Sequence, residues 1–230
     1  MVDGGRAMGD LETVRLSKRT LKDSAEALIR RALLDGVMKP GEVYSANSLA
    51  RTLEISNSPV REAMMTLAER GLLELVRNRG FRVVEMTLED RLEVYELRRL
   101  IEVEAVRRVA GLRLSESVAT ELRRLADMTI VAFGEGGEGL ISEYLEADHQ
   151  FHMYIVDLLG NRRWSDMVER LRDQSRINGF YMHLREAGMV KRTAEEHLAL
   201  ADAIISRDVQ RAAEVMDRHL EYARPVPPAE

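Results

Sequence analysis

The chain has 230 residues, of which 45% are hydrophobic and 32% charged, and this length is sufficient for two hydrophobic cores. It contains no cysteine, which excludes disulfides, thiolate metal sites and cysteine nucleophiles. No apolar run approaches the ~18 residues needed to cross a bilayer, and residues 1–20 lack a secretory signal pattern. We therefore expect a cytoplasmic protein without a membrane partner.

The net charge of −5 is distributed unevenly. Residues 1–86 carry 14 Lys and Arg against 12 Asp and Glu, a balance of +2. Residues 87–230 carry 20 against 27, a balance of −7. A near-neutral to basic N-terminal segment joined to an acidic C-terminal segment suits a protein that contacts nucleic-acid phosphates through one surface only.

The N-terminal part of the chain is expected to begin with a flexible arm over residues 1–16, where no periodicity is sustained. A helix from Leu21 to Gly36 follows, and Pro40 and Gly41 break it. A short helix is predicted over residues 45–55. In the first helix, apolar residues repeat at spacings of three and four: Leu21, Ala25, Leu28, Ile29, Ala32 and Leu33.

The segment "SNSP" at residues 56–59 is predicted to form a turn. Ser58 can cap the next helix, and Pro59 suits its first position. This helix should stop at Gly71. Two short strands should follow, over residues 72–76 and 81–86, joined by a polar turn at residues 77–80.

After Met86 every predicted element is a helix. "TLED" resembles a capping box that opens a long helix. One side of this helix should be formed by Val94, Leu97, Ile101, Ala105 and Val109. Ser115 is expected to cap the next helix, which ends in a "GEGGEG" loop. Further helices are predicted over residues 140–159, 161–181, 192–206 and 208–223.

The order helix, short helix, turn, helix and hairpin is typical of a winged helix-turn-helix. Its third helix can enter a major groove about 12 Å wide, while the hairpin touches an adjacent groove or the backbone. Hydroxyl groups suit phosphate contacts, and Arg61 can donate two hydrogen bonds to guanine. The residues expected to face double-stranded operator DNA are Ser56, Asn57, Ser58, Arg61, Arg77, Arg79 and Gly80.

We therefore predict a mostly α protein in two domains. A winged helix-turn-helix with a small β-hairpin wing should occupy residues 17–86. An all-α helical bundle should occupy residues 87–224, with a tail at 225–230. Such a protein is a sequence-specific DNA-binding transcriptional regulator.

The segment "SLARTLEISNSPVREAMMTLAERGLLEL…GFRVVEM" resembles the winged-helix domain of the GntR family of bacterial regulators. The motif "SPVREAM", the following "GLLE" and the glycine of the wing carry the likeness. The resemblance implies a homodimer on a pseudo-palindromic operator. It also implies DNA contacts from Ser56, Ser58, Arg61 and the wing around Arg79 and Gly80. Many relatives have an arginine where this chain has Asn57.

Three of the five histidines lie on apolar helix faces in the second half of the chain. Each has apolar residues three, four or seven positions away: His152, His197 and His219. Asp148 stands one turn before His152 on the same face. Three inward imidazoles and one carboxylate suit a divalent metal such as Zn or Ni, with Mn or Fe also possible. The alternative is that each histidine is a hydrogen-bonded core residue. His149 and His183 lie off this pattern and are interpreted as structural or surface groups.

Arg98 lies among apolar residues of the long helix, so its guanidinium should face the bundle interior. A buried arginine needs a partner. Either Glu102, one turn later, is that partner, or Arg98 clamps a carboxylate effector through two hydrogen bonds.

The second half resembles the FCD domain of the fatty-acid-regulator branch of the GntR family, over roughly residues 88–223. The likeness rests on "YELRRLIEVEAVRRVA", "EADHQFHMYIVDLLGN" and "EEHLALADAIISRDVQRAAEVMDRHL". It implies metal ligands at Asp148, His152, His197 and His219, and an effector contact at Arg98. The implied effector is a small carboxylic acid bound beside the metal. A tilt of the helix that starts near Thr87 would then change how the two winged-helix domains of a dimer are positioned on DNA.

Three functions are open at this point. The chain is an acid-responsive regulator, a metal-responsive repressor whose signal is the metal itself, or a metalloenzyme fused to a DNA-binding module. Three histidines and an aspartate could activate water. However, the sequence has no nucleophile elbow, phosphate-binding glycine loop or HExxH motif, so we expect no enzyme activity.

Overall fold

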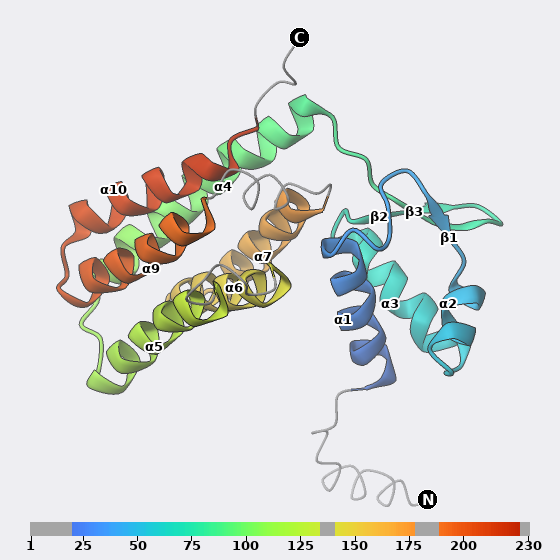
Figure 1. Cartoon of the computed structure of the whole chain (residues 1–230), viewed down its shortest axis with the longest axis horizontal. Coiled ribbons are helices and arrows are strands. Elements are labelled where there is room, and N and C mark those ends of the chain that lie inside the picture. The colour runs from blue at the N-terminus through green and yellow to red at the C-terminus, as the bar shows by residue number, and fades with distance from the viewer. Residues whose placement is uncertain (1–19, 134–140, 178–188, 226–230) are drawn as a thin grey trace, which may run out of the picture.

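The computed structural model describes residues 20–133, 141–177 and 189–225 (Figure 1). In this view α1 to α3 and the strands form one part, and the remaining helices form another. The predicted fold class is confirmed: a winged helix-turn-helix precedes an all-α bundle, and no strand follows β3 within the described ranges. The predicted arm, the "GEGGEG" loop and all but the first residue of the predicted tail lie outside these ranges.

The winged-helix head consists of three helices and three strands. They are α1 (Leu21–Leu34), β1 (Val43–Tyr44), α2 (Ala46–Thr52), α3 (Asn57–Glu69), β2 (Leu73–Val76) and β3 (Gly80–Val83). The sheet is antiparallel in the order β1-β3-β2. We did not predict β1, which pairs with Phe81 and Arg82. Two residues are too few for a period-two pattern, so only the pairing reveals this strand.

The apolar repeat of α1 is buried only in part. Leu21 and Leu28 are 59% and 55% exposed. The buried residues are Ala25, Ile29 and Leu33, one turn apart along a single stripe. Leu21 lies at the first helical position, and Leu28 lies about 100° around the helix from Ile29.

The predicted start of α3 is also wrong. The N-cap residue is Ser56 rather than Ser58, and its side chain makes no capping hydrogen bond. Pro59 occupies the third helical position, which it tolerates because the first N–H groups of a helix have no intrahelical acceptor. The Ser58 hydroxyl instead donates to Glu62 Oε1 at 2.9 Å.

The helical bundle begins with the predicted capping box, formed by Thr87 and Asp90. Ser115 Oγ accepts from the Val118 N–H, as predicted. Leu97, which its spacing places on one side of the long helix with Val94 and Ile101, is 45% exposed. In the part of the bundle that the structure describes, the helices are α4 (Leu88–Gly111), α5 (Glu116–Phe133), α6 (Ile141–Asp157), α7 (Arg162–Arg176), α9 (Val190–Ile205), α10 (Val209–Leu220) and the 3₁₀ turn η1 (Glu221–Ala223). None of the described helices is long and apolar enough to cross a membrane.

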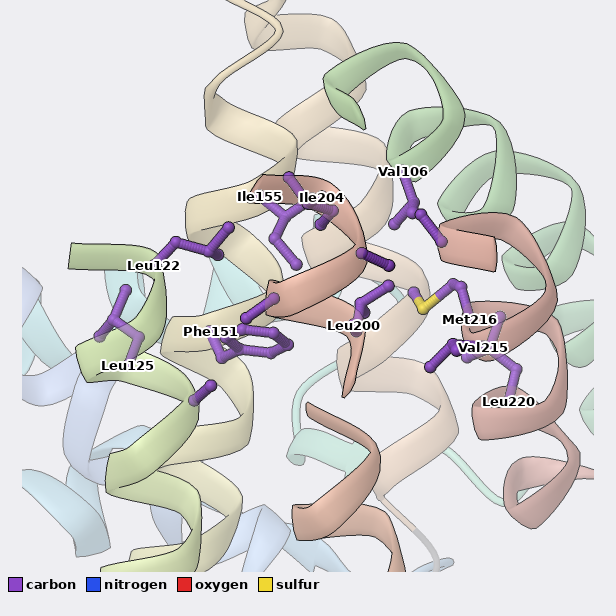
Figure 2. Packing of buried hydrophobic residues seen from close by; sticks show 14 of the residues in the cluster. Val106, Leu122, Leu125, Phe151, Ile155, Leu200, Ile204, Val215, Met216 and Leu220 are labelled. Atoms are coloured by element: carbon purple, nitrogen blue, oxygen red, sulfur yellow. The ribbon is translucent and has the colours of Figure 1, made fainter. Parts of the chain in front are cut away.

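The bundle core is formed by side chains from helices far apart in the sequence. Figure 2 shows Leu122 of α5, Phe151 and Ile155 of α6, Leu200 of α9 and Met216 of α10 packed in one layer. Burial of these apolar groups stabilises the bundle. The same helices also place polar side chains in the interior of the bundle, where they form the candidate metal centre described below.

Candidate DNA interface and candidate metal centre

The start of α3 and the tip of the wing border one surface hollow of about 300 Å³. Its lining includes four of the predicted DNA-facing residues: Asn57, Arg61, Arg79 and Gly80. Ser56 and Ser58 lie beside it, exposed at the start of α3. The structure therefore brings the predicted residues of helix and wing to one face.

Two local contacts shape this face. The Asn57 amide donates to Asn47 Oδ1, which ties the start of α3 to α2. Gly80 has a φ of 129°, and a Cβ there would collide with the Tyr44 carbonyl. Only glycine fits this close approach of β1 to the wing. Asn47 and Asn78 also line the hollow, and sequence reasoning did not assign them to the interface.

The four predicted metal ligands meet inside the bundle. Asp148 and His152 come from α6, His197 from α9 and His219 from α10, and none is more than 1% exposed. One candidate ligand atom from each lies within 4.8 Å of the others. The Nε2 atom of His152 is 3.2 Å from Nε2 of both His197 and His219.

The other ring nitrogens face hydrogen-bond acceptors. His197 Nδ1 is 3.0 Å from Thr129 Oγ1, whose own proton is donated to the Ala126 carbonyl. His219 Nδ1 is 3.3 Å from Glu196 Oε2. His152 Nδ1 lies 3.3 Å from Glu102 Oε2 but makes no hydrogen bond among the described residues. The acceptors beside His197 and His219 favour a proton on their Nδ1 atoms and direct their Nε2 lone pairs toward the centre of the cluster, as in histidines that bind metals.

Asp148 completes the cluster. Its Oδ2 accepts hydrogen bonds from Arg172, at 2.5 Å, and from Arg176. Its Oδ1 lies 3.3 Å from His197 Nε2 and has no hydrogen-bond donor among the described residues. A carboxylate oxygen and three nitrogen lone pairs directed at one point repel each other unless a cation lies between them. The donor set therefore fits a divalent metal.

The protonation states also suit ligation. Burial lowers the pKa of His197 to about 4. Burial lowers the pKa of His152 as well, and Arg172 lowers it further. Burial alone would raise the pKa of Asp148, but the guanidinium groups of Arg172 and Arg176 hold that pKa well below its usual range. At neutral pH His152 and His197 are thus neutral and Asp148 is ionised, as metal ligands must be.

Arg98 is buried and lies beside the cluster. Its Nε donates to Glu102 Oε1 at 2.7 Å, and its Nη1 donates to Ser175 Oγ at 3.0 Å. The structural partner expected for Arg98 is therefore present. Arg172 Nη1 donates to Glu102 Oε2 at 2.8 Å, so a continuous network joins Arg98 to Asp148.

Sequence reasoning missed Arg172 and Arg176. The available signal was their spacing, since they lie one turn apart and Arg172 follows Val168 by one turn. His149, expected to be a structural or surface group, is partly buried, and this burial lowers its pKa to about 2. His183 lies outside the described residues.

The head exposes one face formed by α3 and the wing, and a helical bundle follows it in the chain. This combination is that of a DNA-binding transcriptional regulator. The comparisons identify its family. The family described as "Bacterial regulatory proteins, gntR family" matches residues 21–83, and the FCD domain matches residues 93–222. The chain belongs to the GntR family and carries an FCD domain, as the resemblance implied. It is thus a regulator and not an enzyme.

Relatives and solved structures agree with this assignment. The chain is 31% identical over 145 residues to the uncharacterized HTH-type transcriptional regulator YdhC of Bacillus subtilis, an alignment that spans 63% of each protein. It is 25% identical to the HTH-type transcriptional repressor GlaR of Escherichia coli, over 84% of this chain and 89% of GlaR. The structure of E. coli McbR/YncC superposes with a TM-score of 0.76 at 22% identity, over 88% of this chain and 94% of McbR/YncC, which shows a shared fold.

Proposed function

We propose that the chain binds operator DNA as a homodimer, and that a small carboxylic acid bound beside a divalent metal controls its operator affinity. The DNA contacts would come from Ser56, Asn57, Ser58, Arg61 and the wing at Arg79 and Gly80. The observation that carries the proposed metal site is the convergence of one ring nitrogen from each of three histidines and one carboxylate oxygen within 4.8 Å.

Asp148, His152, His197 and His219 would hold the metal, with Zn or Ni favoured over Mn or Fe. The bound metal would supply a Lewis acid that anchors a carboxylate oxygen. A metal that accepts more than four ligands keeps a position for that oxygen. The buried contacts of Thr129, Glu196 and Glu102 would orient the three imidazoles.

The charge around the cluster favours an anionic effector. Three guanidinium groups, of Arg98, Arg172 and Arg176, surround the carboxylates of Glu102 and Asp148. A divalent cation adds two further positive charges. Buried positive charge is stable only beside negative charge. Arg98 is the proposed clamp for the incoming carboxylate, because a guanidinium matches a carboxylate through two parallel hydrogen bonds.

Metal analysis of the purified chain tests the metal site. We expect His197→Gln and His219→Gln to lose most of the bound metal at neutral pH. His149→Gln is the matched control, because His149 lies next to Asp148 on α6 and is partly buried but is not one of the four clustered ligands. Full metal content in both ligand variants would contradict the assignment.

Native mass spectrometry of the same preparation tests the effector and the dimer. We expect a dimer mass with one metal ion and one small acid per chain. A metal that stays bound through purification favours the acid as the signal. Weak, reversible metal binding without an acid would instead favour the metal-responsive repressor.

A further inference from the structure

Helix α7 contacts the cluster of candidate metal ligands on one side and the winged-helix head on another. Arg172 and Arg176, one turn apart, face the cluster. Asp173 and Ile177, also one turn apart, face the head. In Figure 1 the C-terminal end of α7 points toward the head, close to α1 and β2.

The contacts on the cluster side are buried ion pairs. Arg172 donates to Asp148 at 2.5 Å and to Glu102 at 2.8 Å, and Arg176 donates to the same oxygen of Asp148. α7 thus holds the candidate metal ligand Asp148 directly, through two arginines. A displacement of its carboxylate therefore acts on two side chains of α7 at once.

The contacts on the head side begin at Asp173. Its carboxylate is fully buried, and both of its oxygens lie 3.0 Å from Arg30 Nε of α1. Arg70, at the end of α3, lies 3.7 Å from the same carboxylate. Asp173 thus joins the first and third helices of the head to α7.

The residues after Asp173 extend this contact. Gln174 Nε2 donates to the Arg70 carbonyl at 3.2 Å, and a Cβ on Gly71 would lie 2.5 Å from Gln174 Nε2. Ile177 is 1% exposed and belongs to the hydrophobic cluster of the head, together with Ile29 and Phe81. The end of α7 is therefore part of the core of the head.

We propose that α7 transmits the state of the metal centre to the DNA-binding head, with Asp173 as the coupling residue. This inference rests on the proposed function. Helices pack as nearly rigid elements, so a shift of Asp148 that moves Arg172 and Arg176 also moves Asp173 and Ile177. Arg30 and Arg70 then shift α1 and α3 relative to the bundle. The alternative route, through residues 84–87 into α4, offers a chain connection but leaves these contacts unused.

Hydrogen–deuterium exchange of the full chain tests the route. The protein is stripped with a chelator and then supplied with Zn²⁺ or Ni²⁺ alone. We expect exchange to slow in α6, α9 and α10, and exchange in α1 to change by about five- to 150-fold, the usual size of coupling between sites.

The test variant is Asp173→Asn, which keeps the shape of the side chain and removes its charge. In this variant the metal should still slow exchange in α6, α9 and α10, while the response of α1 disappears. Asp202→Asn is the matched control, because it removes an exposed ion pair with Arg123 between α5 and α9. Its α1 should respond as in the unmodified chain. If Asp173→Asn does not fold, Arg30→Gln removes the same contact from the head side and should give the same result.

Three outcomes overturn the inference. If α1 still responds to metal in Asp173→Asn or in Arg30→Gln, the coupling takes another path. If α6, α9 and α10 respond in the unmodified chain but α1 does not, the metal site stands and the coupling does not exist. If α6, α9 and α10 do not respond to either metal, the metal-binding part of the proposed function fails, and this inference fails with it.

Discussion

At the scale of single residues, Arg61 is the side chain best placed to read DNA sequence. It is exposed on the second turn of α3 and lines the hollow shared with the wing. A guanidinium that donates two hydrogen bonds to guanine discriminates between bases, whereas a contact to phosphate only adds affinity.

We expect Arg61→Ala to weaken specific operator binding by about 1–3 kcal/mol while the fold is kept. Binding titrations at fixed salt, against operator and random DNA, measure this loss, and circular dichroism checks the fold. Arg113→Ala removes the same charge at an exposed position in the helical domain and should leave specificity unchanged. Equal discrimination by Arg61→Ala and the unmodified chain would refute the assignment.

The clustering of the four proposed metal ligands could be predicted from the sequence, and the groups around them could not. Period-three and period-four spacing places His152, His197 and His219 on buried helix faces, so local pattern alone shows that they point inward. That Arg172 bonds Asp148 depends on how α7 packs against α6, which no local pattern contains. The same limit explains why Leu97 and Leu28 belong to apolar repeats and yet are exposed, since a pattern does not show which part of an apolar stripe a neighbour covers.

At the scale of elements, the wing depends on a glycine. The pattern of polar turn and alternating strands predicted the hairpin, but β1 is too short to leave a pattern of its own. Its carbonyl at Tyr44 occupies the space that a side chain on Gly80 would need. The backbone of β3 therefore approaches β1 only because position 80 has no Cβ.

We expect Gly80→Ala to destabilise the head by about 1–3 kcal/mol and to weaken DNA binding through a displaced wing. Strain arises twice, from the positive φ and from the collision with Tyr44. Thermal unfolding and DNA titration measure the two effects. Gly111→Ala is the control, because a Cβ there meets nothing within 4 Å. If Gly80→Ala unfolded at the temperature of that control, the wing would not need this glycine.

At the scale of the whole molecule, buried histidines make stability depend on pH. Burial lowers the pKa of His149 to about 2 and that of His197 to about 4. The unfolded chain protonates its histidines near pH 6.5. Below that pH the unfolded state binds more protons than the folded state, so the free energy of unfolding falls as the pH falls.

For the metal-free protein we therefore expect full stability above about pH 6.5 and a progressive loss between 6.5 and 4, of about 1.4 kcal/mol per pH unit for each such histidine. Urea unfolding reports this through the fluorescence of Trp164, the single tryptophan of the chain. His149→Gln should reduce the slope by one histidine's share. A urea midpoint that did not change from pH 7 to pH 5 would mean that these rings are protonated as readily folded as unfolded.

The measurement that tests the central claim most directly is operator affinity in the presence and absence of a small acid. An operator is first selected from random duplexes with the full chain. The dissociation constant of the metal-loaded protein is then measured at fixed salt against a panel of small mono-, di- and tricarboxylates, with Arg98→Ala and the chelator-stripped protein in parallel. We predict that at least one acid changes the affinity by about five- to 150-fold, and that this change is absent in both parallel samples. An affinity that no acid in the panel alters, but that metal removal alone changes, would contradict the account and identify the metal as the signal.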